Sequence, residues 1–443
     1  MEHVPAAQSL ALALGVGSAI SLVCTRWRVP PILFLLLAGV ALGRGGARLV
    51  GTYNLGDALT AFITIAVAVL VFEGGLHLSV TGLRARGRAV AGLLSLGPIV
   101  TFTLATLAAR LVLRFEWDIA ALLGAVLIVT GPTVVQPLLR RWRLSPNLHT
   151  TLWAEAVLLD PVGVLAVVAV LDFVLADARP SAGASVSQAL VAGAVPLATG
   201  LLAGAAVGAA ARAALHFLSR QSSPDPRQMS LFAMAACMTA VGIGEWTAPQ
   251  GGLVAVTLCA VILAGSRALG AEDMKRFKEQ VAAVLVGGLF VLLGSAVEPR
   301  SFQALEPRDA LFVAVLMLVV RPLAVLTSTL RSELTPRERA FACFLAPRGL
   351  VATSTCSLAV AQIADAAASL TDQGSSVATP QDIAHAARLL ADARHAHTVL
   401  LLLVVTTVSV GTLLGPLFAT LLRVREIRQD EPIAPHAAAA PPA

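Results

Sequence analysis

Two acidic residues, Glu155 and Asp160, lie inside an apolar stretch that runs from about Leu152 to Leu171. A carboxylate at the middle of a bilayer costs on the order of 3 kcal/mol or more, so such residues usually serve a function. Pro161 cannot donate a hydrogen bond to the Val157 carbonyl, which leaves that oxygen near the Asp160 carboxylate. Carboxylate, carbonyl and hydroxyl oxygens together suit Na⁺, K⁺ or Li⁺. We predict that Asp160 holds a proton and an alkali cation in turn; the alternative is a structural role.

Glu155 is expected to have a different role. It lies five residues before Asp160, about 140° round a helix, so the two side chains face different neighbours. A buried arginine keeps its charge and needs an acidic partner. We take Arg348 as that arginine and predict a structural Glu155–Arg348 salt bridge, rather than direct ion binding by Glu155.

Two other charged residues are assigned only accessory roles. Arg321 lies in the middle of an apolar run and needs an acid or several carbonyls, which the sequence does not identify. Glu73 lies near the end of a helix expected at 57–78. It is expected to line an entrance funnel, to meet a loop arginine such as Arg84, or to lie on the surface.

Two expected helices contain signals for an interruption inside the membrane. One contains Thr130-Gly131-Pro132-Thr133 and the other contains Ala346-Pro347-Arg348-Gly349. Proline removes a backbone donor and glycine permits unwinding. Unwound backbone survives at that depth only where protein or a water-filled cavity satisfies its polar groups. We therefore predict helix breaks at both motifs, with the alternative that they are proline kinks without function.

These breaks supply the remaining groups of the predicted site. If the first break lies beside the helix of Asp160, the hydroxyls of Thr130 and Thr133 become ligands for the cation. Paired Gly/Pro-interrupted helices at corresponding positions of two halves are the best sequence indication of a transporter binding site.

Composition places this site in a membrane protein. Of the 443 residues, 57% are hydrophobic and 13% are charged, against roughly 25% charged in a soluble domain. Mean hydropathy is +0.82. We predict an all-α polytopic protein with about 13 transmembrane helices, embedded in the lipid bilayer, with no nucleic-acid partner and no resident cofactor.

Counting apolar runs against the roughly 20 residues that cross a bilayer gives the expected helices. They lie at 6–24, 29–43, 57–78, 89–112, 118–139, 149–172, 186–217, 229–247, 250–266, 279–298, 309–329, 338–364 and 395–423. The interrupted helices are the fifth and the twelfth, a separation typical of two inverted repeats joined by helix seven. The polar linker 366–393 is expected to be a loop with a short helix, and the tail 429–443 to be disordered.

Basic residues predict the orientation. Twenty of the 32 Lys and Arg fall in loops after odd-numbered helices and eight in loops after even-numbered ones. Because cytoplasmic loops carry the excess of positive charge, we expect the N-terminus outside and the C-terminus inside, in a plasma (inner) membrane.

At this point the motifs resemble the NhaP-type monovalent cation:proton antiporters, relatives of the animal sodium/proton exchangers. The resemblance covers about residues 10–423. The motifs that show this resemblance are Phe72-Glu-Gly-Gly-Leu76, Thr130-Gly-Pro-Thr133, Glu155-Ala-Val-Leu-Leu-Asp160, Gln250-Gly-Gly-Leu-Val-Ala-Val256, Val320-Arg-Pro-Leu323 and Pro347-Arg-Gly349.

The resemblance implies a homodimer in which an ion-binding core, about 89–172 and 279–364, moves against dimerisation helices within a domain spanning 1–428. It implies that Asp160 is the ion-binding aspartate and that Glu155 and Arg348 form the family's buried salt bridge. The sequence departs from the family pattern at Leu159, where Asn is frequent, and at Thr130-Gly131, where Thr-Asp is frequent. These departures leave the choice of cation open.

We therefore expect exchange of Na⁺, or of K⁺, for H⁺, and one-for-one stoichiometry because no second carboxylate adjoins Asp160. A channel or transporter without proton coupling is the alternative, although no filter-like repeat occurs. An intramembrane enzyme is not expected, since the sequence lacks His-Glu-x-x-His, Gly-x-Ser-x-Gly and a phosphate loop. A transporter of organic anions would need Arg348 not to be neutralised.

Overall fold

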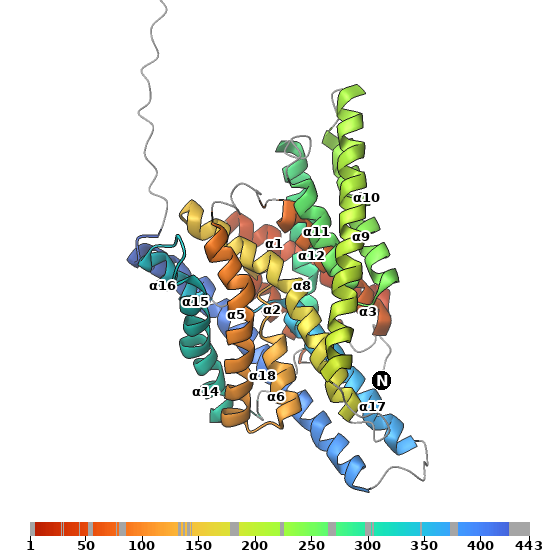
Figure 1. Ribbon diagram of the computed structural model, residues 1–443, viewed down its shortest axis with the longest axis vertical. Coiled ribbons are helices and arrows are strands. Elements are labelled where there is room, and N and C mark those ends of the chain that lie inside the picture. Colours follow the sequence, from red (N-terminus) through yellow and green to blue (C-terminus); the bar gives the residue numbers. More distant parts are fainter. Residues whose placement is uncertain are drawn as a thin grey trace, which may run out of the picture.

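The computed structural model consists of helices joined by short connections, with no strand among the residues it describes (Figure 1). Those residues are 5–27, 29, 31–43, 45–51, 56–76, 78, 86–131, 134–135, 138–139, 142, 144–177, 186–221, 226–264, 272–296, 303, 305–345, 348–372 and 380–424.

The helices follow the apolar runs of the sequence. Their bounds are α1 Ala6–Trp27, α2 Pro31–Leu42, α3 Gly56–Leu76, α5 Gly87–Ala108, α6 Trp117–Val126, α8 Pro146–Asp177, α9 Val186–Gln221, α10 Pro226–Thr247, α11 Gly251–Leu263, α12 Glu272–Ala296, α14 Pro307–Val315, α15 Arg321–Thr329, α16 Pro336–Phe344, α17 Leu350–Asp372 and α18 Pro380–Leu421. Within the described residues, eight helical segments are long and apolar enough to cross a membrane and five more are shorter apolar helices. These thirteen segments confirm the expected helices in number and order.

The polar linker differs from its prediction. The sequence predicts a loop with a short amphipathic helix at 366–393, but α17 continues to Asp372 and α18 already begins at Pro380, so more of the linker is helical than predicted. The linker is rich in alanine, which has the highest helix propensity, and proline fits the first turn of a helix. With 42 residues, α18 is about 63 Å long, so its first turns extend well beyond a hydrocarbon core of about 30 Å (Figure 1).

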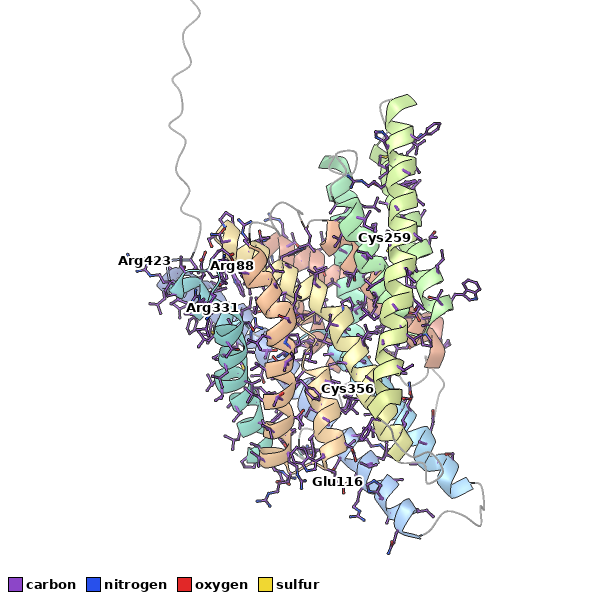
Figure 2. The ribbon with its side chains drawn as sticks, in the orientation of Figure 1. Arg88, Glu116, Cys259, Arg331, Cys356 and Arg423 are labelled. Atoms are coloured by element: carbon purple, nitrogen blue, oxygen red, sulfur yellow. The ribbon has the colours of Figure 1, made fainter. Side chains whose placement is uncertain are left out.

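Two groups of helices are visible in the packing. In one, α9, α10 and α3 surround α11, while α1 and α2 pack on α12. In the other, α5 packs on α15, and α6 lies against α5 and α8. Side chains cover both groups (Figure 2).

Two of the membrane helices contain π-helical segments. The helix that begins as α5 ends in a π-helical segment, η2 Ala109–Leu113, and the α14–α15 helix contains another, η4 Leu316–Val320. These are the fourth and eleventh predicted helices, seven apart, as are the two interrupted helices. The first π segment ends its helix, whereas the second lies in the middle of its helix, so the two are not at the same place along the helices. Such π segments are often found at functional sites.

Close helix contacts rest on glycine. A Cβ atom on Gly17 of α1 would lie 2.4 Å from the backbone carbon of Gly287 in α12. A Cβ atom on Gly204 of α9 would lie 2.4 Å from the carbonyl oxygen of Ala255 in α11. Because the opposing atoms belong to backbone, neither contact can be relieved by moving a side chain.

We expect Gly17→Ala to destabilise the protein by about 1–3 kcal/mol, the usual cost of overpacking. Gly15→Ala is the matched control, since Gly15 lies on the same helix with nothing within 4 Å of the added atom. Thermal unfolding of both variants in detergent measures the difference. Equal melting temperatures would show that α1 and α12 are not packed as described.

Candidate functional site

Asp160 lies in the middle of α8 with no exposed surface. Its Oδ1 accepts a hydrogen bond of 2.9 Å from the backbone N–H of Gly131. Its Oδ2 has no hydrogen-bond partner among the described residues. The α8 helix stays continuous through Pro161, which has no N–H to offer the Val157 carbonyl. A buried carboxylate oxygen without a donor needs a proton or a cation to be stable.

The two predicted breaks exist and touch each other. The α6 helix ends at Val126, and Gly131 adopts a left-handed φ of 59°. A Cβ atom on Gly131 would lie 2.6 Å from the Cα atom of Gly349, which sits between α16 and α17. Glycine is needed at Gly131 both for its φ angle and for the close approach to Gly349. Pro132, Thr133 and Pro347 lie outside the described residues.

Arg348 serves the breaks and not Glu155. Its Nη1 donates to the carbonyl oxygen of Val129 at 3.2 Å, and its backbone N–H donates to the Thr407 hydroxyl at 3.5 Å. The Val129 carbonyl lies just after the end of α6, where carbonyls have no partner within the helix. The positive charge of Arg348 also complements the negative C-terminal end of α6.

The predicted Glu155–Arg348 salt bridge is therefore wrong in its partner. Glu155 forms a bidentate ion pair with Arg321: Nη2 donates to Oε2 at 3.0 Å and Nη1 donates to Oε1. Both side chains are buried. The Nε of Arg321 donates to the carbonyls of Leu345 and Ala342 at 3.1 and 3.3 Å.

The reason for the error is geometric. The 140° between Glu155 and Asp160 correctly separates their neighbours, but the angle does not say which helix lies in that direction. Arg321 begins α15 directly after η4, and its guanidinium reaches the backbone after α16 as well as Glu155. Arg321 thus replaces Arg348 as the partner of Glu155.

Thr130 directly precedes Gly131, which contacts Asp160, and it also lies beside the Glu155–Arg321 pair. Its hydroxyl is buried and has no partner among the described residues. A small cavity beside it is lined by Glu155, Arg321, Ala156 and Leu345, among others. Thr130 therefore remains a candidate ligand for the cation.

The sequence did not predict the hydrogen bond from the Gly131 N–H to Asp160. The available signal for this backbone turn was the tolerance of glycine for left-handed φ angles.

Glu73 is buried with 3% of its surface exposed, so it does not lie on the surface. It belongs to α3, whose Gly74 carbonyl accepts a 2.8 Å hydrogen bond from the Trp153 indole. A Cβ atom on Gly74 would lie 2.9 Å from Val157. Glu73 thus lies next in sequence to the point where α3 contacts α8 at Trp153 and Val157. Arg84 lies outside the described residues.

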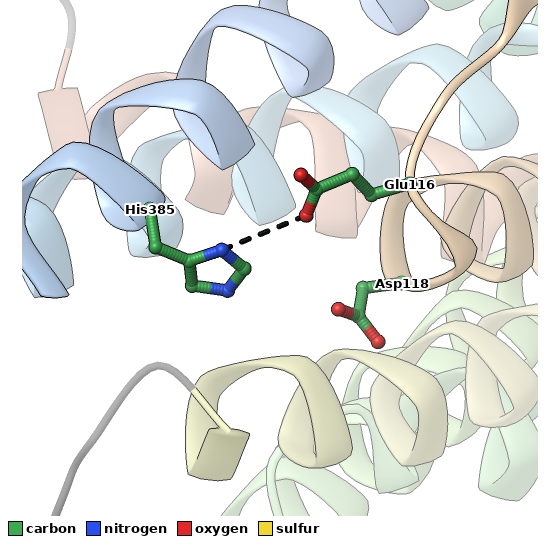
Figure 3. A group of neighbouring side chains, drawn as sticks. All are labelled: Glu116, Asp118 and His385. Atoms are coloured by element: carbon green, nitrogen blue, oxygen red, sulfur yellow. Dashed lines mark ion pairs between the residues drawn. The ribbon is translucent and has the colours of Figure 1, made fainter. Parts of the chain in front are cut away.

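A separate polar cluster joins α6 to α18 at the other end of α6. Glu116 and Asp118 precede or begin α6, and His385 belongs to the first turns of α18 (Figure 3). The His385 Nδ1 lies 3.6 Å from a Glu116 oxygen. Deeper along α18, the His395 ring nitrogen lies 2.9 Å from a carboxylate oxygen of the fully buried Asp309. These contacts fix α18 to α6 and α14, remote from Asp160.

The chain is similar to a family of known proteins and to individual antiporters. The family described as "Sodium/hydrogen exchanger, transmembrane" matches residues 10–424. The K(+)/H(+) antiporter NhaP of Alkalimonas amylolytica is 28% identical over 359 residues, which is 77% of this chain and 58% of that protein. The Na(+)/H(+) antiporter 1 of Methanocaldococcus jannaschii is 24% identical over 167 residues, covering 37% of this chain and 39% of that protein.

The fold is shared with a solved structure. The sodium proton antiporter MjNhaP1 from Methanocaldococcus jannaschii, at pH 8, matches with a TM-score of 0.75 and 18% identity, covering 94% of this chain and 98% of that one. The chain spans less than two thirds of the length of the curated relatives named above.

Double-mutant cycles test whether Glu155 pairs with Arg321, as observed, or with Arg348, as predicted from the sequence. We expect Glu155→Gln and Arg321→Gln each to destabilise the protein by about 3–5 kcal/mol, because each leaves a buried charge unpaired. The double variant should be far more stable than the sum of the single effects predicts. The control cycle, Glu155→Gln with Arg348→Gln, should be closer to additive. Unfolding in detergent measures both cycles, and stronger coupling to Arg348 would contradict the observed pairing.

Proposed function

Because the chain belongs to the sodium/hydrogen exchanger family, we propose that it is a secondary antiporter that exchanges a monovalent alkali cation, Na⁺ or K⁺, for H⁺. The observation that supports this most directly is the Asp160 carboxylate. This carboxylate is fully buried. Its Oδ1 accepts a hydrogen bond from the Gly131 N–H, and its Oδ2 has no partner among the described residues. The relatives named above include both a K(+)/H(+) and a Na(+)/H(+) antiporter.

One carboxylate couples the two ions by competition. The Gly131 N–H orients Oδ1, which leaves Oδ2 to bind either a proton or the cation. Thr130 and the Val157 carbonyl are the further oxygens of this chain that we assign to the cation, with Thr133 as predicted from the sequence. An ionised and empty site is costly to carry through an apolar barrier, so net movement requires one ion or the other.

Asp160 is the single group that we assign to the exchange, because the neighbouring charges have partners of their own. Glu155 is neutralised by Arg321 in a bidentate pair. Arg348 is engaged by the Val129 carbonyl and supports the crossing of the breaks. Glu73 is assigned an accessory role on the approach to Asp160 along α8.

The cycle we propose is alternating access. The ion-binding core, which includes the interrupted helices, moves against dimerisation helices in a homodimer in the plasma membrane. The N-terminus lies outside and the C-terminus in the cytoplasm, following the bias of basic residues in the loops. The polypeptide has no enzymatic role in this scheme and needs no cofactor.

A channel of the same fold without proton coupling is the competing function. Asp160 has no exposed surface, which favours a site that opens to one side at a time over a continuous pore. The decisive difference is coupling, since a channel would pass the cation without moving protons in return.

We expect Asp160→Asn to abolish exchange while the protein stays folded, because the amide can still accept from Gly131 but can bind neither a proton nor the cation in this role. Dequenching of a pH dye in proteoliposomes on adding Na⁺, K⁺ or Li⁺ measures exchange. Asp172→Asn is the matched control, because Asp172 is an exposed aspartate on the same helix. An active Asp160→Asn variant with a normal melting temperature would refute the assignment.

We also expect exchange to be electroneutral, because Asp160 is the single uncompensated carboxylate assigned to the ions. A voltage-sensitive dye in the same proteoliposomes should report no potential during Na⁺- or K⁺-driven exchange, and dissipating any potential with an ionophore should leave the rate unchanged. A potential that appears on adding the cation and disappears in Asp160→Asn would show unequal stoichiometry.

A further inference from the structure

A crevice of about 650 Å³ opens on the outer surface of the bundle, between the α14–α15 helix and α18. Its α18 wall is a stripe of residues at four-residue spacing, Leu402, Thr406, Val410, Leu414 and Phe418. That spacing keeps a single face of the helix along the crevice. The facing wall includes Val313, Met317 and Pro322. Thr406 is the one polar side chain among these residues.

The crevice faces the membrane and not the protein interior. Leu318 on one rim is 75% exposed, and Leu414 on the other is 41% exposed. In a chain of this family the surroundings of such apolar rims at mid-helix are lipid tails. A void there would lose packing contacts on one side, so it is filled by hydrocarbon.

The dimensions select the occupant. Sixteen residues separate Leu402 from Phe418, so the crevice follows about 24 Å of α18. A long, apolar crevice of about 650 Å³ suits an extended acyl chain that lies along the helix.

One end of the crevice leads to basic side chains. Phe344 of α16 stacks on Phe418 of α18 with ring centroids 4.1 Å apart, and both rings line the crevice. Arg337 precedes Phe344 by seven residues, two turns of α16, and so lies on the same face nearer the end of the bundle. Arg423 follows the end of α18.

The chain segments that carry these two arginines are joined through Ser145. Ser145 donates its backbone N–H to the Val424 carbonyl at 2.9 Å and its hydroxyl to Glu338. Val424 adjoins Arg423 and Glu338 adjoins Arg337, so the two exposed arginines lie at the same end, where Figure 2 shows Arg423 beside α16. Glu338 is buried in the capping box of α16 and does not face the arginines' surroundings as a free acid.

We propose that this crevice binds one acyl chain of an anionic phospholipid, whose phosphate lies at Arg337 and Arg423. The lipid fills the space between α15 and α18 and extends over the Phe344–Phe418 pair to the surface. Arg321 and Thr407 belong to the same two helices and serve the buried site, so the lipid packs directly behind the elements that hold it.

Lipid retention and thermal stabilisation of the purified protein test this binding. We expect phosphatidylglycerol to raise the melting temperature of delipidated protein more than phosphatidylcholine with the same chains, and native mass spectrometry to detect the retained anionic lipid. Leu414→Trp should fill the crevice and remove both effects. Leu413→Trp is the matched control, since Leu413 is exposed on the same helix and does not line the crevice.

The head-group contact is tested separately. Arg337→Gln and Arg423→Gln should each weaken binding of the anionic lipid about fivefold, with little change for phosphatidylcholine. If Leu414→Trp does not fold, Thr406→Phe fills the crevice from about two turns away. Equal anionic-lipid retention and stabilisation in the filled variant and in Leu413→Trp would overturn the proposal. These assays do not depend on ion exchange, so their outcome is separate from that of the proposed antiport.

Discussion

The hydrogen bond from the Gly131 N–H to Asp160 is the contact on which the rest of the architecture depends. It exists only because α6 stops short in the middle of the bundle and its chain turns through a left-handed glycine. An unwound segment at that depth is unstable unless other groups satisfy its polar atoms. The second interrupted helix provides this at the crossing, where Gly349 packs against Gly131 and Arg348 holds the Val129 carbonyl.

Four charged residues lie buried around the helix breaks: Glu155, Arg321 and Arg348 have fixed partners, whereas Asp160 has one oxygen without a described partner. Glu155 and Arg321 satisfy each other, and Arg348 is directed to backbone oxygen. Asp160 alone among these keeps an oxygen with no partner in the described part of the chain. Because an unpaired charge is costly in surroundings of low dielectric constant, this oxygen strongly favours binding a proton or a cation. This contrast, more than the presence of acids as such, distinguishes a transport site from a structural ion pair.

The irregular helices follow the same division. The π segment η4 ends where Arg321 begins α15, and a second π segment, η2, ends the helix that begins as α5. The two interrupted helices form a pair in space, since their breaks touch at Gly131 and Gly349. The two inverted repeats remain a prediction from the sequence. The α18 helix links this site to the membrane surface, because one face holds Thr407 against Arg348 and another borders the lipid-facing crevice.

The sequence by itself determined the membrane class, the order of the thirteen apolar segments, the two breaks and Asp160 as the buried acid, because hydropathy and Gly/Pro chemistry are local properties. It did not determine which arginine meets Glu155, the helical continuation of α17 and α18 into the linker, or the N–H that holds Asp160. Arg321 and Arg348 both carry a charge that needs an acid, and one-dimensional spacing ranks them equally. Only the packing of α15 against α16 and α5, and of α5 against α8, which depends on side chains far apart in sequence, decided that Arg321 faces Glu155 and that Arg348 faces a helix end.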